Sequence, residues 1–447
     1  MFLNRFSSGF QKILVNTGYL FGERVFNMGL SLVVGIYVAR YLGPNEFGLW
    51  QYANSLVALF TAIASLGTAN IVIRDLVEQP SEKEGAILGT TFILMLGAGI
   101  ATALLTIFTG LLINNETVTH WLIIIASVNL VLQAFNAFDY WFQSQVLAKY
   151  SVYARTIAQV IVSILKVLFI ILSLNVIYFA LTAVLAGVVR IIIWLLNYKR
   201  RQKDLNNWEF DVQYAKKLLL DAWPLILSGI SVAIYMKIDQ VMIKSMMNAG
   251  AVGNYAVAVR LSELWYFIPL GIASSVFPTI IRAKNVSQEH YHRRLQYLYD
   301  IMAGISIVIA LPLTFLSTPL ITFLFGAEYS MAGPVLSVHI WAGIFVFFGV
   351  ARSKWIISEN YQKYGMIFTG SGAITNILLN LWLIPTMGIM GAAWATVISQ
   401  IIAAWLLGYF FDDIRISSKM IFKSIISSLL VYPVINSVRN VIKEAYE

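Results

Sequence analysis

The sequence predicts an all-α integral membrane protein with about 12 transmembrane helices, arranged as two six-helix lobes around a central cavity. Of its 447 residues, 59% are hydrophobic and 12% are charged. A water-soluble globular protein could not bury that much apolar surface. Apolar stretches also recur along most of the chain, and about 20 apolar residues in a helix cross the hydrocarbon core of a bilayer. These two observations predict the fold class.

The predicted spans follow one another with short gaps. We expect them near residues 13–39, 47–71, 86–113, 118–142, 151–173, 175–198, 217–243, 252–280, 297–325, 333–357, 364–384 and 389–411. The longest gap, about 199–216, is too short for a folded soluble domain. The chain has no cysteine, and its four histidines are not paired at ligand spacing within a span, so a bound metal or other cofactor is not expected.

The lysines and arginines between the spans lie almost wholly in alternate gaps. One set of gaps holds 22 of the 31 basic residues, with Arg155 and Arg352 counted among them, and the opposite set holds only Arg40 and Lys244. Because basic loops resist translocation, this bias predicts that both termini are cytoplasmic. The net charge of +9 is therefore mainly a topology signal, and nucleic acid is not an expected partner. No removable signal peptide is expected at the amino terminus.

A weak internal repeat divides the chain. Phe47 and Gly48 match Val252 and Gly253 at a shift of 205, and further matches follow in the next span. We therefore expect an amino-terminal lobe over 1–205 and a carboxyl-terminal lobe over 206–411. Residues 412–447 form a separate cytoplasmic or interfacial segment. Whether 420–438 lies at the interface or spans the bilayer is left open, although Pro433 and the charges after it favour the interface.

Several predicted spans carry polar residues on one helical face. The second, fourth and fifth spans hold such stripes of polar or small residues: Gln51, Asn54, Ala58, Thr61, Ser65 and Thr68; Asn129, Gln133, Asn136, Tyr140 and Gln143; and Arg155, Gln159, Ser163 and Lys166. These faces either pack helix against helix or line a wet cavity. The sequence does not choose between the two.

Ionisable residues within spans are the strongest functional signal, because a charge at the bilayer centre costs about 3 kcal/mol or more. The candidate substrate-binding cations are Arg24, Arg260, Lys237, Arg190 and Lys166. The candidates for ion or proton coupling are Asp139, Asp239 and Glu263. The deep charges are mainly basic, which suits an anionic headgroup such as phosphate. Internal pairing is the alternative: Arg260 and Glu263 are one turn apart, and Lys237 or Lys166 could extend to the interface.

A set of short motifs resembles the Wzx-type polysaccharide (O-antigen) flippases of the multidrug/oligosaccharidyl-lipid/polysaccharide exporter superfamily. The motifs are Ala39-Arg40-Tyr41-Leu42-Gly43-Pro44 with Phe47-Gly48, Leu66-Gly67, Ile73-Arg74-Asp75, Phe138-Asp139-Tyr140-Trp141-Phe142-Gln143, Ile238-Asp239-Gln240-Val241-Met242-Ile243 and Val252-Gly253-Asn254-Tyr255-Ala256-Val257-Ala258. They occur in order, and the resemblance extends to about residue 411.

The resemblance implies a flippase that moves an undecaprenyl-diphosphate-linked oligosaccharide across the bacterial inner membrane by alternating access. The cargo would be an O-antigen or a related repeat unit of lipopolysaccharide or polysaccharide biosynthesis. A basic cavity with Arg24, Lys237, Arg260 and Arg190 would hold the diphosphate, with coupling to H⁺ or Na⁺ and contacts to other polysaccharide assembly proteins. The sugars, the coupling ion and the oligomeric state stay open.

Two other functions are weighed against this one. A drug or cation antiporter of the same superfamily would need a cavity rich in acids, whereas the deep charges here are mainly basic. A membrane enzyme of lipid-linked glycan assembly would need a large outer loop, and the outer gaps, such as 114–117, are short. The sequence therefore favours a transporter that is not an enzyme.

Overall fold

The computed structural model describes residues 8–201 and 204–429, and these residues form helices and connecting turns without a β-strand. The chain divides into two compact units, Met1–Val241 and Met242–Glu447, with the boundary inside helix α8. The predicted lobe boundary after residue 205 lies one span earlier. It stays a prediction about the sequence repeat.

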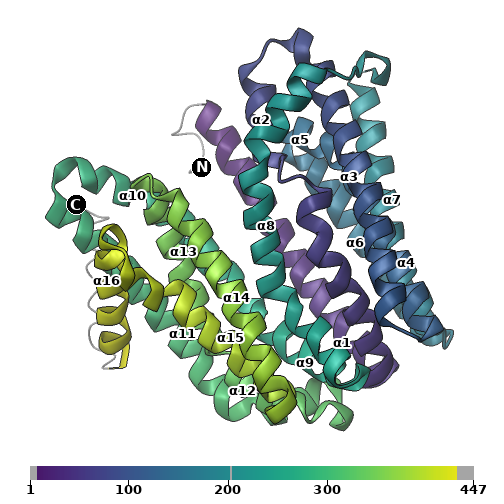
Figure 1. The fold of residues 1–447 in the computed structure, drawn as a ribbon. Coiled ribbons are helices and arrows are strands. Elements are labelled where there is room, and N and C mark those ends of the chain that lie inside the picture. The colour runs from purple at the N-terminus through teal and green to yellow at the C-terminus, as the bar shows by residue number, and fades with distance from the viewer. Residues whose placement is uncertain (1–7, 202–203, 430–447) are drawn as a thin grey trace. The chain divides into compact units, whose positions relative to one another are not determined.

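The amino-terminal unit contains α1 to most of α8 (Figure 1). Its elements are α1 (Ser8–Ala64), α2 (Ala69–Glu78), η2 (Ser81–Lys83), α3 (Glu84–Ile113), α4 (Thr117–Leu132), η3 (Gln133–Phe135), α5 (Asn136–Ser144), α6 (Ala148–Ile171), α7 (Val176–Arg200), η4 (Leu205–Asn207) and α8 (Val212–Met246). Helix α3 packs on α4, α6 packs on α7, and α1 contacts both α4 and α6.

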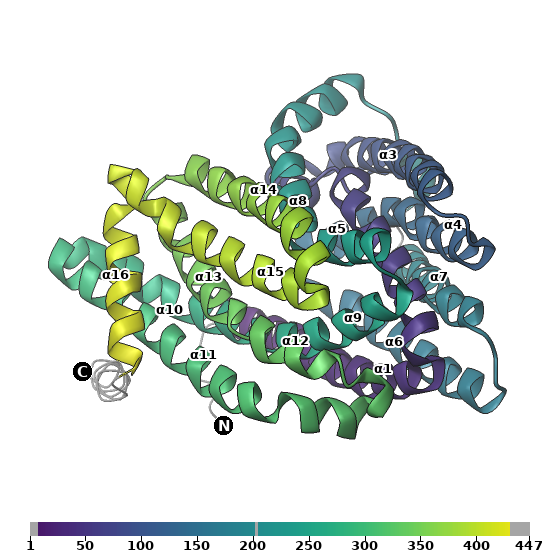
Figure 2. The same ribbon diagram turned by 60° about the horizontal axis from the view of Figure 1, so that its bottom comes forward.

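The carboxyl-terminal unit continues from the end of α8. Its elements are α9 (Ala249–Glu263), η5 (Leu264–Tyr266), α10 (Phe267–Val286), α11 (Gln288–Phe325), η6 (Ala327–Tyr329), α12 (Ala332–His339), α13 (Ala342–Ser358), α14 (Gln362–Met387), α15 (Ile389–Ala404), η7 (Leu406–Phe410) and α16 (Asp412–Leu429). Helices α13, α14 and α15 lie side by side, and α11 contacts α10, α12, α13 and α16 (Figure 2).

Eleven helical stretches of the described residues are long and apolar enough to cross a membrane. The first, Gly22–Glu78, has 57 residues. At 1.5 Å per residue a continuous helix of that length would measure about 85 Å, nearly three times the hydrocarbon thickness. The helix is instead broken at Gly43, whose φ of 67° lies in the left-handed region and is followed by Pro44. This stretch therefore supplies two spans, and the predicted all-α membrane fold is confirmed.

Large apolar side chains are exposed in rows along the helices. On α3, Leu104, Phe108 and Leu112 are 63%, 60% and 69% exposed at a spacing of four residues. On α11, Phe315 and Phe323 are 77% and 76% exposed. Such rows would favour aggregation in water, but they match the hydrocarbon of a bilayer. They mark helix faces directed at lipid.

Helices α14 and α15 pack closely because a glycine faces the neighbouring backbone. A Cβ atom at Gly391 would lie 2.1 Å from the carbonyl oxygen of Leu383. The turn between the two helices is made by Gly388, with a φ of 61°. Small residues at such contacts let transmembrane helices approach.

The carboxyl-terminal helix α16 packs on α11 through hydrogen bonds. Tyr299 and Ser417 share a hydrogen bond of 2.7 Å, and the Ser424 hydroxyl donates to Asp300 at 2.6 Å. Within the described residues, α16 is not among the helices that qualify as spans. The open question about 420–438 extends past residue 429, outside the described residues.

Candidate functional site

A cluster of charges connects three helices inside the amino-terminal unit. Arg155, near the start of α6, binds Glu23 of α1 through two hydrogen bonds, Nε to Oε1 and Nη2 to Oε2, both of 3.0 Å. The same guanidinium reaches Asp139 of α5, with 3.5 Å between Nη1 and Oδ2. Two parallel N–H···O bonds are the strongest geometry available to an arginine and a carboxylate. Arg155 therefore links α1, α5 and α6.

Amide side chains complete this charge cluster. Asn27, one turn after Glu23, donates to Glu23 Oε1 at 3.0 Å. Gln143, one turn after Asp139, donates to Asp139 Oδ2 at 2.9 Å. The second oxygen of Asp139 is buried and accepts no hydrogen bond. Because the cluster has low exposure, removal of one charge would leave its partner uncompensated.

Arg190 of α7 lines a cavity of about 240 Å³ next to the charge cluster. Asn129, Gln133 and Asn136 contribute polar groups, and Leu132, Gly187, Ile191 and Trp194 complete the lining. Arg190 interacts electrostatically with both Arg155 and Asp139, and its buried Nε donates no hydrogen bond. The cavity therefore contains an arginine nitrogen with spare donor capacity inside an apolar bundle. Such an arrangement suits an anionic group.

Local sequence explains why these amides meet. The predicted span 118–142 is interrupted by one 3₁₀ turn, η3, which begins at Gln133 and ends one residue before Asn136. Asn129, Gln133 and Asn136 lie at steps of four and three, so they share a helical face. In this span the polar stripe lines a cavity. In α6, by contrast, Gln159 donates to Ser163 at 3.5 Å, which is a contact within one helix.

The remaining predicted residues of the amino-terminal unit are spread over several helices. Arg24 is exposed on α1 and, among the described residues, forms no hydrogen bond or ion pair. Lys166 of α6 places its ammonium 5.2 Å from the ring centroid of Trp50. Lys237 is half-buried on α8, and Asp239 is buried about two turns before the end of that helix. Of the predicted site residues in this unit, the structure brings Arg190 and Asp139 together.

Arg260 and Glu263 lie in the carboxyl-terminal unit. They occupy the last turn of α9, just before the 3₁₀ turn η5, and both side chains are half-buried. Their role in a site stays a prediction.

The charge pattern of the sequence missed two members of the charge cluster, Glu23 and Arg155, and one buried arginine in the carboxyl-terminal unit. Arg155 was counted as a loop cation because it stands near the start of a span, and the cation that binds Glu23 is 132 residues away in the chain. Arg352, also counted with the loop cations, is 2% exposed and donates to the Ala404 carbonyl and the Ser418 hydroxyl. Its guanidinium lies 4.8 Å from the ring centroid of Phe368. Partners this distant in the chain give no signal in a single sequence.

Comparisons with known proteins identify the family. A family model described as polysaccharide biosynthesis protein matches residues 13–284, more than half of the chain. The chain belongs to the polysaccharide biosynthesis protein family. A second model, described as MatE, matches residues 224–382. Both matches agree with the resemblance to the multidrug/oligosaccharidyl-lipid/polysaccharide exporter superfamily, which is confirmed.

Relatives of this polysaccharide biosynthesis family member support the same conclusion. It is 28% identical over 179 residues to a probable flippase, AglR, from Haloferax volcanii, covering 38% of this chain and 37% of that protein. It is 20% identical over 420 residues to the capsular polysaccharide biosynthesis protein CapF from Staphylococcus aureus, covering 89% and 99% of the two chains. The match to AglR thus spans little more than a third of that relative.

A solved structure shows the same fold. The lipid II flippase MurJ, in an inward closed conformation, matches with a TM-score of 0.69 and 16% identity, covering 94% of this chain and 92% of MurJ. At this identity the match establishes the fold alone. The polysaccharide biosynthesis family member is thus a multi-pass membrane protein with a transporter fold.

Proposed function

We propose that the protein moves an oligosaccharide linked to a polyisoprenyl diphosphate, undecaprenyl diphosphate in a bacterium, from one leaflet of the cytoplasmic membrane to the other by alternating access. The cargo is an O-antigen, capsular or related repeat unit. The family match, the flippase relative and the capsular relative support this proposal. The protein transfers its cargo without altering it chemically.

The observation that carries the proposal is the polar cavity at Arg190. A cavity of about 240 Å³ is smaller than the usual pocket for a whole small-molecule ligand, which begins near 300 Å³. It is suited to the diphosphate and its first sugar contacts. The spare Nε of Arg190 binds a phosphate oxygen, and the amides of Asn129, Gln133 and Asn136 bind hydroxyl groups.

The charge cluster beside this cavity supplies a coupling device. Arg155 is held by Glu23 and Asp139, so its charge is balanced while both carboxylates are ionised. Protonation of Asp139, or binding of a cation there, weakens that contact and leaves more positive charge next to Arg190. Ion entry and diphosphate binding are thereby coupled. Glu263 and Asp239 are the further candidates for coupling, with Arg24, Arg260, Lys237 and Lys166 as further substrate cations.

The test is genetic and biochemical. In a host that lacks its own flippase, the wild-type protein restores surface glycan, and Arg190→Ala reduces it at equal protein abundance while lipid-linked oligosaccharide accumulates in the membrane. Arg200→Ala, at the exposed end of the same helix, is the matched control and keeps wild-type glycan. Normal glycan with Arg190→Ala would remove the cavity from the mechanism.

A second candidate function is a drug or cation antiporter. The MatE match favours it, and so do the two carboxylates, Glu23 and Asp139, that lie against Arg155. It predicts resistance to cationic drugs on overexpression and no effect on surface glycan. The same complementation strain tested for both phenotypes separates the two functions.

A further inference from the structure

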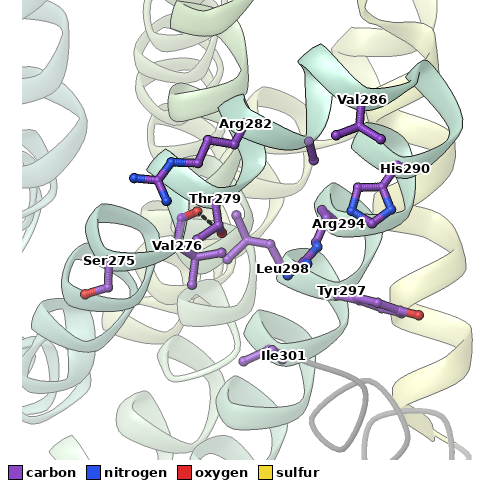
Figure 3. A pocket seen from close by; sticks show the side chains of 11 residues that line it. Ser275, Val276, Thr279, Arg282, Val286, His290, Arg294, Tyr297, Leu298 and Ile301 are labelled. Carbon is purple, nitrogen blue, oxygen red and sulfur yellow. Dashed lines mark hydrogen bonds between the residues drawn. The ribbon is translucent and has the colours of Figure 1, made fainter. Parts of the chain in front are cut away.

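A pocket in the carboxyl-terminal unit, apart from the cavity at Arg190, lies between α10 and α11. It has a volume of about 360 Å³ and is partly open. Figure 3 shows the side chains that line it. Both helices contribute side chains on either side of the corner at Ser287. Its lining includes Val276, Arg282, His290, Arg294, Leu298 and Ile301.

The polar groups of this pocket favour an anion. Arg282 comes from α10, and His290 and Arg294 come from the first two turns of α11. None of the described residues in its lining is acidic. The hydroxyl groups on the α10 wall are already engaged, because Ser275 donates to Gly271 at 3.0 Å and Thr279 donates to Val276 at 2.7 Å. Because both hydroxyl protons are used, the hydrogen-bond donor that the α10 wall offers a ligand is the Arg282 guanidinium.

His290 adds a third donor to this set. Arg293 Nη2 lies 3.0 Å from His290 Nδ1, and a guanidinium can only donate, so Nδ1 accepts. The ring proton is then on Nε2. The backbone N–H of His290 is capped by the Ser287 hydroxyl at 3.1 Å, and the positive end of the α11 dipole lies at the same corner.

Charge and apolar surface are separated along the pocket. Arg282, His290 and Arg294 lie within seven residues of the corner at Ser287, whereas Val276 and Ile301 lie 11 and 14 residues from it. At 1.5 Å per residue these apolar residues are about 16 to 21 Å from the corner along their helices, and about 9 to 11 Å beyond Arg282 and Arg294. The corner belongs to the set of basic loops, and the apolar end extends toward the middle of the spans. A soluble anion would contact only the cations, whereas an amphiphile would contact both the cations and the apolar residues.

We propose that the α10–α11 pocket binds an anionic glycerophospholipid from the leaflet that the basic loops face. The phosphate lies against Arg282, His290 and Arg294, and the first carbons of an acyl chain lie along Val276, Leu298 and Ile301. Val286, 75% exposed at the corner, contacts the glycerol region. The volume of about 360 Å³ holds the headgroup and the start of the chains, with the rest of the lipid in the bilayer. Anionic lipid is enriched at the cytoplasmic surface, where basic residues attract it.

The experiment measures lipid retained by the full-length purified protein in native mass spectrometry. The probes are phosphatidylglycerol and phosphatidylcholine with identical acyl chains. We expect the wild type to retain phosphatidylglycerol about tenfold more strongly, and Arg282→Gln and Arg294→Gln each to weaken that retention about fivefold. Arg415→Gln removes an exposed arginine of α16 outside the pocket and is the matched control, with wild-type retention.

Two further arms keep the result decisive. Val276→Trp keeps every cation but fills the apolar end, so it also lowers phosphatidylglycerol retention. If Arg294→Gln does not fold, Val276→Trp and Arg282→Gln, the latter at an exposed position, still test whether the pocket binds the lipid. Glycerol phosphate, which carries the headgroup without chains, does not displace the lipid at equal concentration.

Equal retention of the two lipids, wild-type retention in both Arg282→Gln and Val276→Trp, or full displacement by glycerol phosphate would each overturn the lipid site. The last result would indicate a site for a soluble anion. The measurement requires no transport, so its outcome is independent of the proposed flippase activity.

Discussion

Arg155 on α6 and Glu23 on α1 form a two-point ion pair across 132 residues of sequence, with both N···O distances at 3.0 Å. The pair is enclosed enough for its loss to be costly, since the side chains are 28% and 11% exposed. It also connects α1 to α6, whose Arg155 interacts electrostatically with Arg190 in the cavity wall. The contact is therefore expected to contribute to the stability of the amino-terminal unit.

Replacing Arg155 by Ala leaves Glu23 and Asp139 without their cation. We expect a loss of about 1–3 kcal/mol of stability, because removing one partner strands low-exposure charged groups. Thermal unfolding of the purified protein in detergent measures it. The Arg155→Ala, Glu23→Gln double variant should lose less than the sum of the two single variants. Additive losses would mean that the two residues are not coupled.

Asp139→Asn tests the coupling device. The substitution removes a negative charge but keeps the shape, so Arg155 and Arg190 lose a balancing carboxylate. We expect transport of lipid-linked oligosaccharide to become less dependent on external pH or sodium than in the wild type, in proteoliposomes with an imposed gradient. A wild-type dependence on both ions in Asp139→Asn would exclude Asp139 from coupling.

Gly391→Ala tests the close contact between α14 and α15. A Cβ atom there would collide with the Leu383 carbonyl, which is backbone and cannot swing aside. We expect a loss of about 1–3 kcal/mol, the usual cost of overpacking, seen as a lower melting temperature. Gly365→Ala in α14 is the control, because nothing lies within 4 Å of its Cβ position. It should be neutral or slightly stabilising, since alanine favours a helix more than glycine does.

Arg352→Ala tests how α16 is held. The buried guanidinium donates to the Ala404 carbonyl and the Ser418 hydroxyl. Its removal therefore takes a donor from both groups and leaves a cavity in place of the side chain. We expect α16 to be cleaved faster in limited proteolysis, while the amino-terminal unit stays resistant. Lys354→Ala, two residues further on and half-buried, should leave cleavage unchanged. Unchanged cleavage in Arg352→Ala would show that the hydrogen bonds of Ser417 and Ser424 to α11 hold α16 without Arg352.

Hydropathy and loop charge predicted the membrane fold because both depend only on position along the chain. The polar stripe of Asn129, Gln133 and Asn136 was visible for the same reason, since a helix places steps of three and four on one face. The site needed more. Glu23 and Arg155 meet only when α1 packs on α6, and a one-dimensional pattern assigns faces but not neighbours. Arg352 was misplaced because a position at the end of a span resembles a loop position, although the helix end is covered by α16.

The contact of Arg352 with Ser418 also has a consequence for biogenesis. The two residues are 66 positions apart, and the serine is on the last described helix. During translation Arg352 is synthesised 66 residues before Ser418, so it lacks this acceptor until α16 has formed. The carboxyl-terminal unit therefore completes its packing only after α16 has been synthesised, and a chain cut short ahead of Asp412 would leave the buried Arg352 with one of these two acceptors, the Ala404 carbonyl.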